Sequence, residues 1–228
     1  MYKSLKNRYK PERPWKSDKV TPFPFEGDIP FLQFINTYRN RGTSNWVEQI
    51  ETYDVFLDWC QEFKIIEPDE QNTLSLEGYC YADEANFVRL RAIKLREAVC
   101  EFIDSPLRGR EINEDAVAFF NGTLAEANAH LRFELNGDNL EVTWFDTVEQ
   151  LAAPLWILTK QAETLMLSAN FKDIKKCHCG KFYLDTTRNK TRRWCNPLVC
   201  GNAVRTKNYK ERKRLMELVP GDNYKMVG

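Results

Sequence analysis

Four cysteines within 24 residues constrain the fold of this chain more than any other feature. They form two close pairs, Cys177-x-Cys179 and Cys195-x4-Cys200, with fifteen residues between the pairs. Two pairs of thiolates on either side of a short excursion are typical of a tetrahedral structural zinc site. A catalytic zinc keeps an open coordination position and usually has His or carboxylate ligands. We therefore expect one structural Zn²⁺ ion, held by Cys177, Cys179, Cys195 and Cys200.

The segment between the two pairs has little apolar material of its own. Phe182-Tyr183-Leu184 predicts a short strand, and Trp194 adds bulk beside a cysteine. The metal would replace a hydrophobic core that is too small to be stable alone. One residue separates the first pair, a tighter spacing than the roughly two to four residues usual in zinc knuckles. We interpret that residue, His178, as an exposed loop residue.

The distribution of charge separates this region from the rest of the chain. The sequence has 33 Lys/Arg and 33 Asp/Glu residues, so its formal net charge is zero. Residues 171–214 hold 14 of the basic residues and 3 of the acidic ones, a balance of +11. The remainder holds 19 basic and 30 acidic residues, a balance of −11. This asymmetry indicates a basic module joined to an acidic body.

The basic residues lie in a stretch before Cys195 and in a short helix predicted after Cys200. Lys and Arg at this density bind phosphate oxygens and release counterions, so nucleic acid, and DNA first, is the expected partner. The candidate nucleic-acid-binding residues are Arg188, Lys190, Arg192, Arg193, Arg205, Lys207, Lys210, Arg212, Lys213 and Arg214. Two alternatives stay open. One is an RNA-binding protein that stacks Tyr183, Trp194 and Tyr209 on bases, and the other is an interaction module whose finger docks on an acidic protein surface, including its own body.

The fold class expected for the body is mainly α with one β-hairpin. Apolar spacings of three and four predict three helices: one capped by Thr52 with a face at Tyr53, Phe56, Leu57, Cys60 and Phe63, one over 83–103 through Phe87, Leu90, Ile93, Leu95 and Val99, and one over 113–131 through Val117, Phe120, Leu124 and Ala127. Alternation over 131–135 and 140–144, around turn residues 136–139, predicts a hairpin with one apolar face. A T-x-x-Q capping box at Thr147 predicts a long helix over 148–168, kinked at Pro154.

Composition favours a folded protein, because 43% of the residues are hydrophobic and 13% are aromatic. No run approaches the roughly 18 apolar residues that a membrane span needs. Residues 1–28 are basic and Pro-containing, which predicts a flexible arm without the apolar segment of a secretory signal, so we expect a cytoplasmic protein. Cys60, Cys80 and Cys100 stand alone and are expected to be buried as small hydrophobic residues.

Two stretches resemble known families. Asp185-Thr-Thr-Arg-Asn189, followed by Arg192-Arg-Trp-Cys195 and Cys200-Gly-Asn202, resembles the CGNR zinc finger. Leu32-Gln-Phe-Ile-Asn-Thr37 is similar to the motif that opens the ABATE domain, which usually precedes this finger and is described as a stress-induced transcription regulator. The resemblance implies a zinc-stabilised finger that ends in a basic helix. Ala203 stands where the signature has its final Arg, a role that Arg205 can cover, and Gln33 replaces an Asp of the opening motif.

We therefore expect an arm at 1–28, an ABATE-like helical domain at 29–170, a CGNR-like finger at 171–216 and a tail at 217–228. The expected function is zinc-dependent, DNA-binding transcription regulation, with a body that senses a small molecule or forms a homodimer. Asn36, Thr37 and Arg39 are candidates for a ligand pocket, with the alternative that Asn36 and Thr37 bond to local backbone or cap a turn. No enzyme is expected, because the sequence has neither a nucleophile elbow nor a phosphate-binding loop, and His130 is the only histidine outside the cysteine cluster.

Overall fold

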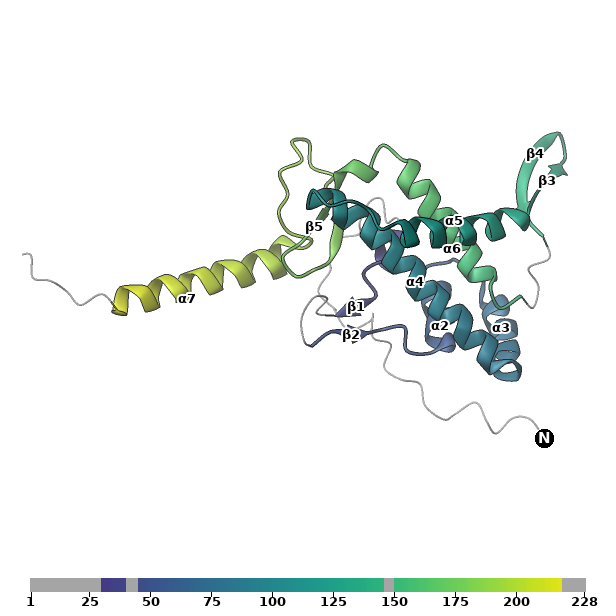
Figure 1. Cartoon of the computed structure of the whole chain (residues 1–228), viewed down its shortest axis with the longest axis horizontal. Helices are drawn as coiled ribbons and strands as arrows, with labels where there is room; N and C mark the ends of the chain where they lie inside the picture. The colour runs from purple at the N-terminus through teal and green to yellow at the C-terminus, as the bar shows by residue number, and fades with distance from the viewer. Residues whose placement is uncertain (1–29, 40–44, 146–149, 219–228) are drawn as a thin grey trace, which may run out of the picture.

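Helices dominate the part of the chain that the structure, a computed structural model, describes: residues 30–39, 45–145 and 150–218 (Figure 1). The predicted arm at 1–28 and Thr147 of the predicted capping box lie outside these ranges. The elements in chain order are α1 (Pro30–Phe34), β1 (Tyr38–Arg39), β2 (Val47–Glu48), α2 (Tyr53–Glu62), α3 (Pro68–Cys80), α4 (Ala82–Leu107), α5 (Glu114–Ala129), β3 (Leu131–Asn136), β4 (Asn139–Trp144), α6 (Ala153–Leu167), the 3₁₀ turn η1 (Phe171–Asp173), β5 (Ile174–Lys176), β6 (Phe182–Leu184), the π turn η2 (Pro197–Gly201) and α7 (Asn202–Leu218). Over the described residues the strands form three antiparallel pairs, β1–β2, β3–β4 and β5–β6. The predicted fold class, mainly α with a hairpin and a small finger, is confirmed.

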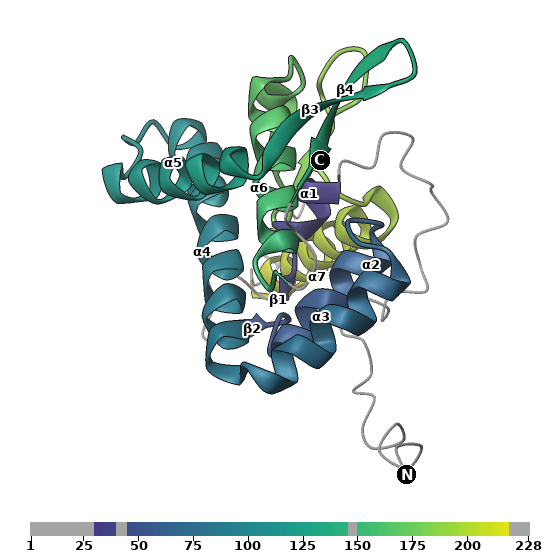
Figure 2. The same ribbon diagram turned by 90° about the vertical axis from the view of Figure 1, so that its right-hand side faces the viewer.

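Helix α4 is the centre of the body and contacts α2, α3, α5 and α6 (Figure 1, Figure 2). Its buried stripe includes Ala85, Val88, Ala92, Leu95 and Val99, whose spacing of three and four places them on one helical face. The predicted face through Phe87 and Leu90 is wrong, because these side chains are 60% and 48% exposed. The alanines let neighbouring helices approach closely, which a search for large apolar residues does not detect.

Helix starts show how capping decides the ends of elements. The side chain of Thr52 accepts a hydrogen bond from the Val55 amide at 3.2 Å and starts α2, as predicted. The predicted kink at Pro154 is wrong, because α6 begins at Ala153 and places Pro154 in its first turn, where a missing amide hydrogen costs little. Helix α3 was not predicted. It buries only Leu74 among its described residues, so the sequence lacks the apolar periodicity that reveals a helix.

The predicted hairpin is confirmed as β3–β4, with Phe133 opposite Val142 and Leu135 opposite Leu140. Its apolar face packs on the body at its base, where Trp144 lies against Ala127, Ala153 and Trp156, but not further out. All four of these side chains are exposed, and the hairpin projects from the helices in Figure 1. Cys60 and Cys100 are buried as expected, whereas Cys80 is exposed at the end of α3, so the prediction for Cys80 is wrong.

Arg96 on α4 is a buried charge within the body, with none of its side chain exposed. Its guanidinium donates to both carboxylate oxygens of Glu48 on β2, at 2.8 and 2.6 Å, and to the Thr37 carbonyl at 3.0 Å. Burial by itself would raise the pKa of the Glu48 carboxyl, but the bonds from Arg96 hold that pKa below its usual value. This pair joins the β1–β2 ribbon to α4.

Candidate metal centre and basic surface

The β5–β6 ribbon, which adjoins the first cysteine pair, packs into the core of the helical body. Ile174, Phe182 and Leu184 are buried in the same hydrophobic cluster as residues of α1, α2, α4 and α6. Lys176 on β5 also forms an ion pair of 2.9 Å with Asp104 on α4. The finger and the body therefore share one core.

Asn36, directly after α1, binds the finger as a neighbouring strand would. Its side-chain Nδ2 donates to the Phe182 carbonyl at 2.8 Å, and its Oδ1 accepts from the Phe182 amide at 2.8 Å. The Tyr38 hydroxyl donates to the Gly180 carbonyl at 3.0 Å. These bonds satisfy backbone groups of Phe182, at the open edge of β6, and of Gly180 in the turn before it.

These contacts give two of the predicted pocket residues a different role. The amide of Asn36 is bonded to the finger and to the Leu32 carbonyl, and Thr37 is buried, with its hydroxyl donating to the Phe34 carbonyl at 2.7 Å. The bonds to Leu32 and Phe34 agree with the alternative that Asn36 and Thr37 bond to local backbone, and the ligand pocket stays a prediction. The side chain of Arg39 lies outside the described residues. Nothing in the local sequence reveals that Asn36 meets Phe182, 146 positions away, because the pairing depends on how the body folds.

The four predicted zinc ligands come together. Their sulfur atoms all lie within 4.8 Å of one another, and the Sγ of Cys195 is 3.5 Å from those of Cys179 and Cys200. A tetrahedral zinc with bonds of about 2.3 Å needs its sulfur ligands about 3.8 Å apart. The donor set and its spacing therefore fit a closed zinc site in which Cys177, Cys179, Cys195 and Cys200 would hold the ion.

The short spacing of the first pair is accommodated by a tight turn. The amide of Cys177 donates to the Lys181 carbonyl at 2.8 Å, and the Gly180 amide donates to the Cys177 carbonyl at 2.9 Å. Gly180 has φ +93°, in the left-handed region that favours glycine. This turn brings the sulfur of Cys179 back beside the others, even though only His178 separates the two cysteines. His178 is exposed, in agreement with its interpretation as a loop residue.

The electrostatics of the cluster also fit a divalent cation. Hydrogen bonding from Cys195 lowers the pKa of the Cys179 thiol to about 5, whereas burial raises the pKa of the Cys200 thiol to about 11. Four thiols this close cannot all ionise without a positive charge among them, since each thiolate disfavours the next. A bound zinc ion would supply that charge and stabilise the thiolates.

Asp185 organises the loop that leads to the second pair. Its fully buried carboxylate accepts from Lys175 at 2.6 Å, from the Thr187 hydroxyl at 2.6 Å and from the Arg192 amide at 3.0 Å. Burial opposes ionisation, but the bonds from Lys175 and Thr187 prevail and hold the pKa of Asp185 well below its usual value. This loop is therefore a fixed structure closed by one carboxylate.

Two of the candidate nucleic-acid-binding residues serve this loop. The guanidinium of Arg192 lies over the Tyr183 ring and donates to the carbonyls of Trp194, at 2.7 Å, and Cys195. Lys190 pairs with Asp173 at 2.8 Å and donates to the Asp185 carbonyl at 2.8 Å. Arg188 and Arg193 are exposed on the same loop. The local sequence Arg-Arg does not distinguish the inward Arg192 from its exposed neighbour.

The last zinc ligand leads directly into the basic helix. Asn196 caps η2, accepting from the amides of Leu198 and Val199 at 2.9 and 3.1 Å, and Cys200 lies within that turn. Gly201 is buried against the Trp194 ring, and a Cβ added there would lie 3.3 Å from that ring, closer than an ordinary contact. From there α7 runs outward from the molecule (Figure 1), and every residue from Arg205 to Leu215 is exposed. The remaining candidate basic residues, Arg205, Lys207, Lys210, Arg212, Lys213 and Arg214, all lie on this helix.

Comparison with known families accounts for both parts of the chain. Residues 28–169 match the model of ABATE, described as "Putative stress-induced transcription regulator". The chain belongs to the ABATE family. Residues 174–213 of this ABATE protein match the model of the CGNR zinc finger, so it carries a zinc finger with one structural zinc site formed by the four clustered cysteines. No curated protein matches the chain. Within the described residues, no helix of this ABATE protein is both long and apolar enough to span a membrane.

Proposed function

We propose that this ABATE protein is a zinc-dependent, DNA-binding transcription regulator that contacts DNA through α7 and the loop at 188–193. The exposure of α7 is the observation that carries the proposal. Between Arg205 and Leu215 the helix has six basic residues and one acidic residue, all exposed. Helices in proteins owe most of their stability to packing, so a surface that binds α7 would stabilise it.

The dimensions and charge of α7 match the major groove of DNA. That groove admits an α-helix, and Arg and Lys side chains neutralise phosphates on both of its sides. The zinc site would fix the first turn of α7 relative to the loop, because Cys200 lies immediately before the helix. Arg188 and Arg193 on the loop would then reach the phosphate backbone beside the groove.

Two observations favour DNA over the alternatives. Single-stranded RNA needs exposed aromatic rings to stack on, but Tyr183 is buried and Trp194 packs against Gly201, which leaves Tyr209 as the exposed one of the three predicted rings. Docking of the basic helix on its own acidic body is disfavoured because α7 extends away from that body (Figure 1).

We propose that the zinc site has a structural role and no catalytic one, since four thiolates leave the metal no open coordination position for a substrate. We also propose that the protein acts in the cytoplasm, because the free thiols of a zinc finger persist in a reducing compartment. A regulator also needs an input, and we assign that role to the helical body.

Selection of bound DNA from a random pool tests the proposal. The zinc-loaded full-length protein should enrich a sequence, whereas the Cys195→Ser variant, which lacks one ligand, should not. Single-stranded RNA in the same binding buffer is the matched competitor. Equal enrichment by both proteins, or preferential binding of the RNA across a salt series, would overturn the proposal.

A further inference from the structure

The four zinc ligands differ in how far solvent reaches them. Cys179 is exposed, whereas Cys177 is buried, with 3% of its surface exposed, and Cys195 and Cys200 are half-buried. Cys179 lies in the tight turn that Gly180 closes, outside the hydrophobic core that holds the neighbouring β5–β6 ribbon. A small molecule dissolved in water therefore reaches Cys179 before the other three ligands.

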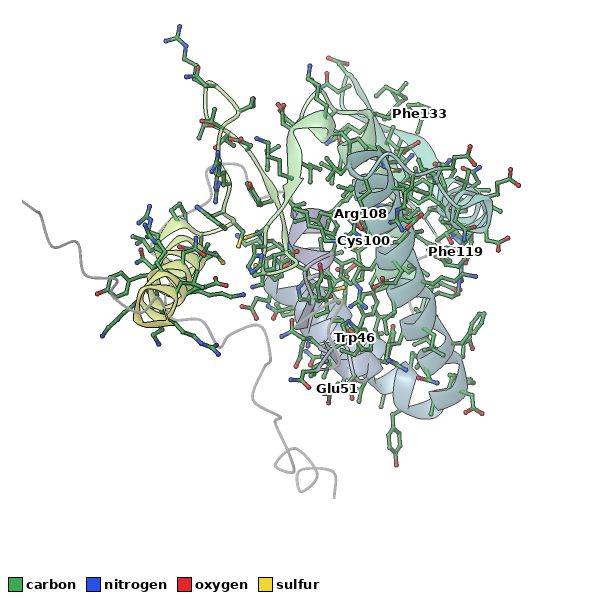
Figure 3. The ribbon with its side chains drawn as sticks, turned by 60° about the vertical axis from the view of Figure 1, so that its left-hand side comes forward. Trp46, Glu51, Cys100, Arg108, Phe119 and Phe133 are labelled. Carbon is green, nitrogen blue, oxygen red and sulfur yellow. The ribbon has the colours of Figure 1, made fainter. Side chains whose placement is uncertain are left out.

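Exposure matters here because a zinc ligand is a thiolate. The thiolate, not the thiol, is the nucleophile that peroxides oxidise, so susceptibility depends on thiolate character and exposure together. The cysteines outside the cluster lack one or both of these properties. Cys60 and Cys100 are buried, and Figure 3 labels Cys100 within the helical body. Cys80 is exposed but does not belong to the four clustered cysteines, so no metal would hold it as a thiolate.

A second thiolate lies beside Cys179. The Sγ of Cys195 is 3.5 Å from the Sγ of Cys179. A disulfide bond is about 2.05 Å long, so the two sulfur atoms would have to approach each other by roughly 1.5 Å. An accessible thiolate with a second cysteine next to it is the arrangement found in redox-sensitive sites. The two residues also lie on opposite sides of the loop at 188–193, so a bond between them would close that loop.

We propose that Cys179 and Cys195 form an oxidisable pair, which a peroxide converts to a disulfide with release of zinc. The Cys179 thiolate attacks one oxygen of hydrogen peroxide, the O–O bond breaks, and a sulfenic acid and a hydroxide ion form. The Cys195 thiolate then attacks the Cys179 sulfur, the S–O bond breaks, and a second hydroxide ion leaves. Two electrons pass from the two sulfur atoms to the two peroxide oxygens, and each hydroxide ion takes a proton from solvent to form water.

The disulfide would affect the two halves of the finger differently. It would still close the loop, so the β5–β6 ribbon could stay in the core of the body. Only Cys177 and Cys200 would be left as ligands, and a structural zinc site needs four. Cys200 would lose its bond to the metal, and the start of α7 would lose its fixed position. This last consequence, unlike the oxidation itself, rests on the proposed DNA binding, and it predicts weaker DNA binding by the oxidised protein.

Treatment of the full-length, zinc-loaded protein with hydrogen peroxide, without DNA, tests the pair. A chromophoric chelator should detect release of the single zinc ion held by the cluster. After the remaining thiols have been alkylated, mass spectrometry of proteolytic peptides should find Cys179 joined to Cys195. Dithiothreitol followed by added zinc should restore the metal content, because a disulfide is a reversible product.

Two variants and a labelling experiment test the role of Cys179. Cys179→His keeps a side chain that can bind zinc but removes the thiol, so peroxide should release its zinc at least about tenfold more slowly. Cys80→Ser, which removes the exposed thiol outside the cluster, is the matched control and should release zinc at the wild-type rate. Labelling of the wild type with limiting N-ethylmaleimide needs no variant, and it should modify Cys179 before the other three ligands.

Zinc that stays bound at a peroxide concentration that fully oxidises Cys80 would overturn the proposal. A first disulfide that does not join Cys179 to Cys195, or first labelling of another zinc ligand, would also overturn it. Because no DNA is present, failure here leaves the proposed DNA binding standing, and failure of the DNA selection leaves the oxidation standing.

Discussion

Arg192 and Arg193 are neighbours in the sequence and have different surroundings. The guanidinium of Arg192 binds carbonyls beside a zinc ligand, whereas Arg193 is exposed. Arg192→Ala should leave two carbonyls without donors, cost about 1–3 kcal/mol and weaken zinc retention against a chromophoric chelator. Arg193→Ala should retain zinc like the wild type and reduce the slope of DNA affinity with salt by about 0.9. Equal loss of zinc in both variants would contradict this division.

Glu48 gives the body a dependence on pH that can be separated from the metal site. Its pKa in the folded state lies below its ordinary value, so its pairing with Arg96 stabilises the protein above the unfolded-state pKa of about 4.3 and is lost as pH falls through the lower folded value. Glu48→Gln should lower the free energy of unfolding by about 3 kcal/mol at pH 7, because it leaves Arg96 buried without a carboxylate partner. Urea unfolding at a series of pH values should show this difference shrinking below about pH 4.

A nearby carboxylate provides the control for this experiment. Glu97 also pairs with Arg96, at 3.0 Å, but its side chain is 41% exposed. Glu97→Gln should therefore cost less than about 1 kcal/mol at any pH. If the two variants lose equal stability, burial of the Glu48 pair is not the source of the effect.

At the scale of elements, the sequence predicts best where periodicity and capping agree. The start of α2 at Thr52 and the strands of the β3–β4 hairpin follow directly from local pattern. The buried face of α4 does not, since small residues and the buried Arg96 occupy it. Likewise α3, with one buried side chain, leaves no amphipathic signal for a sequence to show. In these helices tertiary packing, and not the local pattern of apolar residues, determines which side chains are buried.

The exposed basic residues of α7 allow a test of how this helix binds DNA. If its basic residues contact phosphates, then replacing Arg205, Lys210 and Arg212 with Gln should reduce the slope of log affinity against log salt by about 2 to 3. Fluorescence anisotropy with a selected duplex measures this slope, and Lys64→Gln, at an exposed site on the body, is the control. An unchanged slope would place the DNA contact elsewhere.

The whole molecule depends on bonds between distant parts of the chain. Asn36→Ala should leave the Phe182 amide and carbonyl without their partners, which lowers the free energy of unfolding by about 2–4 kcal/mol. Asn189→Ala, on the exposed loop, should change it by no more than about 0.5 kcal/mol. Urea unfolding measures both, and faster hydrogen exchange at Phe182 in the first variant alone would locate the change.

Removal of zinc should lower the stability of the finger and of the body together. Ile174, Phe182 and Leu184 belong to the core of the body, so loss of the finger's fold would expose apolar surface worth roughly 5 kcal/mol and lower Tm by more than about 10 °C. Scanning calorimetry of the zinc-loaded protein should give a single transition, and chelation should shift all of it. A body that melts at an unchanged temperature after chelation would show that finger and body are independent.

The zinc ligands and the basic helix of the candidate site could be predicted from the sequence, but the contacts that join the finger to the body could not. Cysteine spacing gives four ligands that the structure brings within reach of one ion, and charge distribution gives the basic helix. Neither shows that Asn36 and Tyr38 bind the finger, because residues far apart in sequence carry no local sign of their contact. The inward position of Arg192 was missed for a similar reason, since its neighbours are set by the folded loop.

The bond between Asn36 and Phe182 also affects how such proteins can be recombined. A finger whose strand is hydrogen-bonded to a side chain of another segment cannot be moved to another protein by itself. Grafting it onto a different body would leave the backbone groups of Phe182 on β6 without hydrogen-bond partners. Chimaeras should therefore succeed when the donor finger is transferred together with the helical body whose core it shares. For this chain, the unit of exchange is the finger together with the body that supplies Asn36.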